Sequence, residues 1–196
     1  MNRAVLLLAL FCASFCAQAQ FIGGLPKSEQ RVVAVSGGGI QASMDLKGFT
    51  ADPSITDETT FGSIIGRFTC DDRTETLAGP MRLTVAVADL PKGVSELSGW
   101  NAYAAPHLKQ HASKDYKASR LEGAGGRVIC SMFVFKEIRQ DWCAQHCYFF
   151  IVHEGKVVTL HFISEARTVS DLSAAYKITS QDLEVAQTLS VSTQDR

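Results

Sequence analysis

Apolar and polar residues alternate along several segments, which is the pattern of strands that bury one face. The alternation is clearest in residues 81–90, where Met81, Leu83, Val85 and Val87 share one face. It recurs in residues 40–46, and a shorter β-type run occupies residues 31–35. Residues 61–70 fit either a strand or a helix. The first half of the chain therefore predicts at least three strands.

The second half predicts a central strand and a hairpin. Residues 127–138 are apolar on both faces, which is typical of a central strand, and residues 115–121 fit a further strand. Residues 147–153 and 156–163 flank Glu154-Gly155, and a two-residue hairpin loop of this kind fixes the register. This register places three pairs on the core face, namely Cys147–Phe162, Phe149–Leu160 and Ile151–Val158. It places the pair Tyr148–His161 on the opposite face.

Helical spacing of apolar residues appears in two places. Residues 94–113 fit a helix, although Pro106 predicts a break or kink near Ala105. Ser180 can cap a closing helix that runs to Leu189. The polar residues 48–59 predict a surface loop, and residues 142–146 predict a tight turn. Together the elements predict an α+β fold, in which an antiparallel sheet of about five strands packs against one or two helices and a C-terminal helix closes the domain.

The C-terminal third resembles a known family in its order of elements. It contains a hairpin strand at 148–152, the strand VVTLHFIS at 157–164, a polar stretch and the closing helix DLEVAQTLSVS. Over residues 126–190 this order resembles the end of the Mog1/PsbP-like α/β sandwich family, which includes periplasmic DcrB-type proteins. The resemblance implies a non-catalytic binding or chaperone-like module, and it carries over no functional residue.

The first residues predict export. A positive start at Arg3, an apolar run over residues 4–15 and Ala17-Gln18-Ala19 are typical of a signal peptide cleaved after Ala19. A buried helix, or lipidation at Cys12 or Cys16, is the alternative. We expect a flexible lead-in over residues 20–30, a single domain over 31–196, and a location in the periplasm or outside the cell. No later run approaches the roughly 18 apolar residues of a membrane span, so none is expected after cleavage.

Charge and composition narrow the range of partners. The 196 residues carry 19 Lys and Arg against 20 Asp and Glu, a formal net charge of −1. This balance argues against a nucleic-acid binder, which is usually strongly basic. The sequence contains neither a P-loop nor a dinucleotide-binding fingerprint, so no cofactor is expected.

Four cysteines follow the predicted leader, namely Cys70, Cys130, Cys143 and Cys147. In an exported protein an even number of cysteines indicates two disulfides, and three pairings are open. We favour Cys70–Cys130 together with Cys143–Cys147. Alternatives for the second pair are a redox-active dithiol, or a metal site that includes His146.

Two surfaces are candidates for binding a protein partner. The first consists of acidic loop residues that could fill a basic cleft, with one neighbouring aromatic residue: Asp52, Asp57, Glu58, Asp71, Asp72, Asp141 and Trp142. The second is a sheet-face patch, Tyr148, Phe150, Thr159 and His161, which a helix or a partner must cover. His107 and His111 share a helix face but lack further ligands, so no metal site is predicted.

These observations favour an exported, non-enzymatic binding protein of the cell envelope. An immunity or inhibitor protein that occludes the active site of a toxin or hydrolase is the most specific form of this hypothesis. The first alternative is a periplasmic thiol-redox or small hydrolytic enzyme. The second is a small-ligand or metal-binding module.

Overall fold

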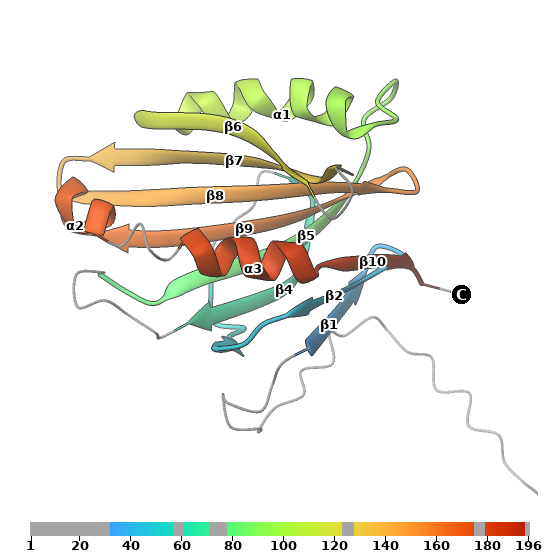
Figure 1. Cartoon of the computed structure of the whole chain (residues 1–196), viewed down its shortest axis with the longest axis horizontal. Helices are drawn as coiled ribbons and strands as arrows, with labels where there is room; N and C mark the ends of the chain where they lie inside the picture. The colour runs from blue at the N-terminus through green and yellow to red at the C-terminus, as the bar shows by residue number, and fades with distance from the viewer. Residues whose placement is uncertain (1–31, 57–60, 71–77, 123–127, 175–178, 195–196) are drawn as a thin grey trace, which may run out of the picture.

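Ten strands form two antiparallel sheets within the parts of the chain that this computed structural model describes, residues 32–56, 61–70, 78–122, 128–174 and 179–194. The α+β class and the antiparallel pairing agree with the sequence, but the expected number of about five strands is wrong (Figure 1). The large sheet has seven strands in the order β3 (Phe49–Ala51), β4 (Ser63–Cys70), β5 (Met81–Asp89), β9 (Lys156–Ala166), β8 (Trp142–His153), β7 (Val128–Arg139) and β6 (Lys114–Glu122). The small sheet joins β1 (Val32–Gly37), β2 (Ile40–Asp45) and β10 (Ser190–Thr193).

The small sheet explains most of the additional strands. β10 follows the closing helix and pairs with β2, so that β2 lies between the first and the last strand of the described chain. β3 lies within the segment predicted as a surface loop, where Phe49 is 2% exposed and supplies apolar contact to the core. A three-residue strand is too short to show the alternation from which longer strands are predicted.

The large sheet has two faces, each with its own core. The α3 face carries Leu83, Val85, Phe149 and Leu160, and it packs against the small sheet and the helix α3 (Thr179–Thr188). The α1 face carries the alternate residues of the same strands and is covered by α1 (Leu97–His111). Because both faces are buried, the central strands are apolar on both sides. The short helix α2 (Val169–Ala174) lies against β8 and β9.

The hairpin register predicted from the sequence is confirmed. Cys147 pairs with Phe162, Phe149 with Leu160, Ile151 with Val158, and Tyr148 with His161. Glu154 and Gly155 both have positive φ, +45° and +76°, as a tight two-residue hairpin turn requires. The predicted tight turn at 142–146 is wrong, because these residues begin β8 and pair with β7 and β9.

The helix α1 begins at Leu97 and ends at His111 without the break expected near Ala105. Pro106 lies inside the helix and is exposed. Proline has no backbone N–H, so the helix lacks the hydrogen bond that this group would donate to the carbonyl of Ala102. Ala102 is also exposed. Water can therefore take the place of the missing hydrogen bond. Trp100, Ala104 and Leu108 form the buried side of the helix.

The predicted signal peptide and lead-in lie outside the described residues. None of the helices in the described ranges is both long enough and apolar enough to cross a membrane.

Candidate functional site

The predicted sheet-face patch is a buried part of the α1 face and not an open surface. The exposed fractions of Tyr148, Phe150, Thr159 and His161 are 6%, 0%, 0% and 3%. Trp100 of α1 lies edge-on to Phe150, with ring centroids 5.6 Å apart. Helix α1 therefore covers this patch, which was one of the two coverings expected from the sequence.

Phe61 completes the cover at the start of β4. Its ring lies edge-on to the rings of Trp100, Tyr148 and Phe150, at centroid distances of 5.5, 6.0 and 5.2 Å. Edge-to-face contacts between aromatic rings are favourable because the positive ring edge meets the negative face. These contacts exclude water from the inner part of the α1 face.

Two histidines and a glutamate continue this face toward the β7–β8 turn. His146 Nδ1 lies 3.0 Å from His161 Nε2, and Glu137 Oε2 lies 3.5 Å from His146 Nε2. The tautomer of the pair decides which of the two ring nitrogens donates the hydrogen bond between the histidines, and the Glu137 carboxylate attracts a proton to His146 Nε2. His161 Nδ1 is buried with no hydrogen-bond partner.

Burial lowers the pKa of His161 well below its ordinary value, and the nearby His146 and Arg82 lower it further. His161 is therefore neutral at pH 7. Its ring stacks on Tyr148 with the centroids 3.9 Å apart and an interplanar angle of 9°. The stacked ring has little freedom to turn, which fixes the direction of its nitrogen atoms.

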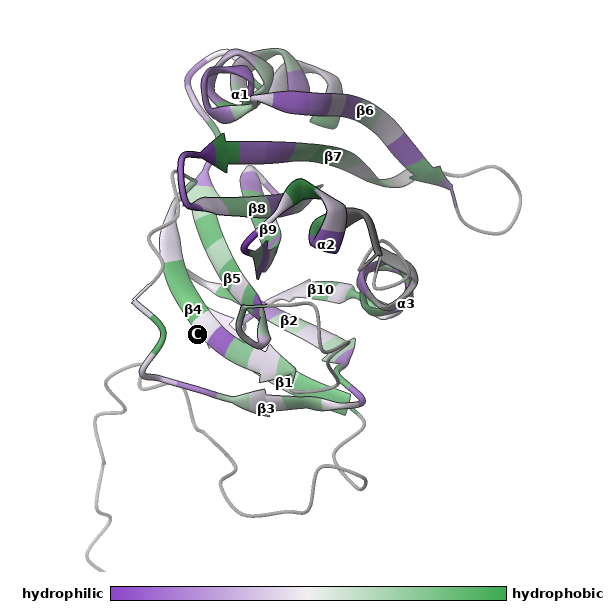
Figure 2. Cartoon of the chain, turned by 90° about the vertical axis from the view of Figure 1, so that its left-hand side faces the viewer, coloured by the Kyte–Doolittle hydropathy of each residue, from purple (hydrophilic) through white to green (hydrophobic). Residues whose placement is uncertain are grey.

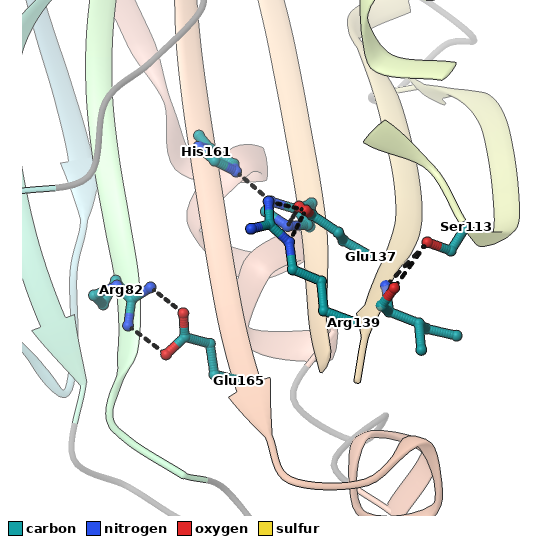
Figure 3. A network of polar contacts seen from close by, with 8 residues as sticks. Arg82, Ser113, Glu137, Arg139, His161 and Glu165 are labelled. Atoms are coloured by element: carbon teal, nitrogen blue, oxygen red, sulfur yellow. Dashed lines mark hydrogen bonds and ion pairs between the residues drawn. The ribbon is translucent and has the colours of Figure 1, made fainter. Parts of the chain in front are cut away.

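An ion pair lies beside the histidines at the open end of the face. The guanidinium of Arg82 donates two hydrogen bonds to Glu165, of 3.1 and 2.8 Å (Figure 3). These bonds are the main reason that the pKa of Glu165 is lowered, and a hydrogen bond from Trp142 contributes to the same effect. Trp142 also stacks with Arg139, whose guanidinium carbon lies 5.5 Å from the ring centroid. Trp142 is thus part of the polar network rather than of a separate loop surface.

Two polar residues of the α1 face, Arg67 on β4 and Thr84 on β5, were not predicted from the sequence. Arg67 pairs with Thr84, and Thr84 pairs with His161 on β9, so the three residues form one row across the sheet. Arg67 Nε and Thr84 Oγ1 are buried with no hydrogen-bond partner, and so is Thr159 Oγ1 two residues from His161. The alternation of strands β4 and β5 was the only signal in the sequence, and it marks these positions merely as polar.

The cysteines do not form the expected disulfides. Cys70, Cys130, Cys143 and Cys147 are all buried, and none is joined to another by a disulfide. Cys143 and Cys147 are four residues apart on the continuous strand β8, a separation of about 13 Å. A disulfide requires Cα atoms within about 7 Å, so this pair cannot close. Cys70 and Cys130 belong to β4 and β7, which β5, β9 and β8 separate in the sheet.

The acidic residues that the structure describes do not form one surface. Asp52 follows β3, where its Oδ1 accepts hydrogen bonds from the backbone N–H and the hydroxyl of Ser54. Asp141 lies exposed in the turn between β7 and β8, and the strands β4, β5 and β9 separate this hairpin from β3 in the sheet. Asp57, Glu58, Asp71 and Asp72 lie outside the described residues.

No metal-binding cluster forms among the His, Cys, Asp and Glu side chains of the described ranges. His107 and His111 are exposed on α1. The ring of His107 lies against Tyr103 and Phe61, at centroid distances of 5.4 and 6.5 Å. This histidine contributes to the aromatic packing of the helix.

A groove of about 380 Å³ opens between α1 and the edge strand β6. Phe133, Tyr116 and Ala105 provide apolar lining, and Lys109 and Arg120 provide positive charge. Lys109 Nζ lies 5.4 Å from the ring centroid of Tyr116, whose hydroxyl is buried with no partner. The two elements lie side by side in both views, and β6 is predominantly hydrophilic (Figure 2).

The sequence matches no protein-family model and no curated protein. Its structure is similar to cyanobacterial PsbP from Synechocystis sp. PCC 6803, at 11% identity and a TM-score of 0.50, covering 83% of this chain and 94% of that one. The Ran-binding protein Mog1p of Saccharomyces cerevisiae is 12% identical, with a TM-score of 0.48 and coverages of 82% and 94%. LpqN, involved in cell envelope biogenesis of Mycobacterium tuberculosis, is 12% identical, with a TM-score of 0.43 and coverages of 78% and 91%. The resemblance of the C-terminal third to the Mog1/PsbP-like sandwich is confirmed, and the chain has a PsbP-like fold.

Proposed function

We propose that this chain is an exported, non-enzymatic protein of the cell envelope that works by binding a protein partner. In its most specific form the proposal is an immunity protein or inhibitor that covers the active site of a toxin or hydrolase. The observation that carries the proposal is the open edge of the large sheet, where β6 and α1 offer a long, exposed and basic contact surface.

The edge strand β6 is well suited to pairing with another chain. It is nine residues long, most of its side chains are exposed, and its outer edge has no neighbouring strand in the described sheet. Unpaired backbone N–H and C=O groups of such a strand can add an extended segment of a partner. The groove beside β6 could then receive side chains from that segment.

The charge of this surface selects an acidic partner. Four basic side chains lie here: Lys114, Lys117 and Arg120 on β6, and Lys109 on α1 facing it. No described carboxylate makes an ion pair with any of the four. Asp115 on the same strand is already bound to Lys136 Nζ at 2.9 Å. The hydrogen bond from Lys136 lowers the pKa of Asp115, which keeps this pair charged and internally balanced. The favoured partner therefore carries negative charge, the reverse of the partner expected from the acidic loops.

The described thiols support a binding role over thiol chemistry. Burial raises the pKa of Cys143, raises that of Cys147 well above its ordinary value, and raises that of Cys130 to about 12. Only the thiolate form attacks a disulfide, and thiols with raised pKa values supply little of it at neutral pH.

The test is capture of a partner from an envelope extract by the exported form of the chain with a C-terminal tag. We expect the charge-reversed variant K117E/R120E to lose the partner, because it reverses the field along β6. The matched control is K47E/K92E, which changes two exposed lysines away from this edge. Equal capture by both variants would contradict binding through β6. A captured hydrolase whose activity the purified protein suppresses would establish the inhibitor form.

A further inference from the structure

We propose that the inner α1 face holds a binding site for a small hydroxy acid, formed by Arg67, Thr84, Thr159 and His161. The ligand would place its carboxylate on Arg67 and its hydroxyl group among the two threonines and the histidine. This site is separate from the β6 edge, because β9, β8 and β7 lie between β5 and β6 in the sheet.

The four side chains gather on one face of three neighbouring strands. Arg67, Thr84 and His161 are direct register partners on β4, β5 and β9, and Thr159 points to the same face as His161. Neighbouring strands are about 4.8 Å apart, so the row from Arg67 to His161 spans about 10 Å. This length matches a small organic acid rather than a macromolecule.

Each of the four side chains has a buried polar atom without a hydrogen-bond partner: Arg67 Nε, Thr84 Oγ1, Thr159 Oγ1 and His161 Nδ1. The exposed fractions of Thr84, Thr159 and His161 are 1%, 0% and 3%. Unpaired buried polar groups are rare in native proteins because they lose their hydrogen bonds to water. Four of them in one place indicate a molecule that pairs with all of them.

The charge of the row identifies the ionic part of the ligand. Arg67 is half-buried and makes no ion pair with any described carboxylate. The neighbouring Arg82 is bound in a bidentate pair to Glu165, so it does not compensate an added anion. A planar guanidinium binds a carboxylate through paired hydrogen bonds, which makes a carboxylate the fitting group.

The histidine pair identifies the second group. His161 Nδ1 donates or accepts a hydrogen bond according to the tautomer of the histidine pair. A hydroxyl group can both donate and accept, so it can pair with this nitrogen in either tautomer. The threonine hydroxyls can both donate and accept, so they can complete the bonding of the same hydroxyl. Glu137 lies 3.5 Å from His146 Nε2 and acts on the proton positions of the pair, so it is a positioning residue for His161.

Ligand binding can be measured with three matched compounds of three carbons. Lactate carries a carboxylate and a hydroxyl, propanoate only the carboxylate, and propane-1,2-diol only hydroxyls. Isothermal titration and the ¹⁵N signals of His161 would report binding to the exported form of the chain. We expect lactate to bind at least tenfold more tightly than either other compound and to shift the Nδ1 signal of His161.

Variants locate the site. R67Q should weaken lactate binding at least tenfold, and T84V, which keeps the shape of the side chain, should weaken it severalfold. The matched control R167Q removes an exposed arginine just after β9 and should leave lactate binding unchanged. E137Q should change the tautomer signature of His161 and weaken lactate more than propanoate. This difference separates positioning of His161 from a general loss of structure.

Several outcomes would overturn the proposal. If lactate shifts no histidine signal, and native mass spectrometry finds no small molecule retained by the purified protein, ordered water alone occupies the row. Equal binding of lactate and propanoate would remove the role assigned to His161. Unchanged lactate binding by R67Q, or by the gentler variant R67K if R67Q does not fold, would place the carboxylate elsewhere.

Discussion

Asp182 lies on α3 with its carboxyl group inside the α3-face core. Its exposed fraction is 3%, and its Oδ1 has no hydrogen-bond partner. Burial raises the pKa of this carboxyl to about 8. The folded protein therefore holds a proton that the unfolded chain releases near pH 4. Because the folded state binds more protons between these values, its stability falls as the pH rises from about 4 to 8.

The variant D182N should remove this loss. At pH 8 we expect its free energy of unfolding to exceed that of the wild type by about 5 kcal/mol, since the pKa is raised by about four units and each unit corresponds to about 1.4 kcal/mol. At pH 4 the two proteins should be nearly equal. Denaturant unfolding across this pH range measures the difference. D141N, which changes an exposed carboxylate, should keep the wild-type slope, and a D182N slope equal to that of the wild type would contradict the prediction.

Single residues show what the sequence could reveal about the candidate site. The pairing of Tyr148 with His161 was predictable because a two-residue turn fixes the register of every pair in the hairpin. Arg67 and Thr84 were not, because their roles depend on pairing between strands that are not fixed by one tight turn. Alternation alone cannot tell a polar residue facing water from one facing a buried cluster.

Among the elements, α1 connects the two candidate sites. Its buried side covers the aromatic part of the α1 face, and its exposed side forms one wall of the groove beside β6. Pro106 lies in the helix interior, where it removes a backbone hydrogen bond. Helix stability around Pro106 therefore affects both sites.

The variant P106A should stabilise the protein. Alanine restores the backbone donor and avoids the proline ring, so we expect the free energy of unfolding to rise by about 1–2 kcal/mol. This gain is smaller than the full helix propensity difference because proline also restricts the unfolded chain. Urea denaturation would measure it. P91A, in the turn after β5, should bring no comparable gain, and a destabilised P106A would show that the ring packs against the protein.

Periodicity predicted the long elements and failed for those with mixed signals. β5 and the β8–β9 hairpin were predictable because every second residue of these strands is apolar, and these apolar residues are buried together on one face of the sheet. The segment from Trp142 to His146 was interpreted as a tight turn that carries Cys143. In the structure this segment instead forms the first part of β8 and is buried on both faces. The exposed fractions of Cys143 and Ala144 are 2% and 0%.

At the scale of the whole molecule, stability comes from two cores that share one sheet. The α3 face and the α1 face each bury a large cluster of apolar side chains, with the central strands contributing to both. Three cysteines, Cys70, Cys130 and Cys147, lie within the first of these clusters as apolar side chains. The α+β class was predictable from the pattern of elements. The small sheet was not, because it pairs β2 with β10, which lies far from β2 in the sequence.

The fold should therefore be insensitive to reductant. We expect the midpoint of thermal unfolding of the chain without residues 1–19 to change by less than about 1 °C when a reductant is added. A native disulfide would contribute about 2–4 kcal/mol, and its reduction would lower the midpoint by several degrees. Thiol titration should find Cys130, Cys143 and Cys147 unreactive before unfolding and reactive afterwards. Reactivity of these residues only after reduction would restore the disulfide hypothesis.

The pairing of β10 with β2 also has a consequence for the order in which the protein folds. Ser190 pairs with Ser43, and Thr188 Oγ1 accepts a hydrogen bond from the backbone of Asp45, 143 residues away. A ribosome delivers β2 long before β10. Until β10 emerges, one edge of β2 stays unpaired, so the nascent chain remains a substrate for chaperones and open to unwanted strand pairing. The arrival of β10 ends this vulnerable period.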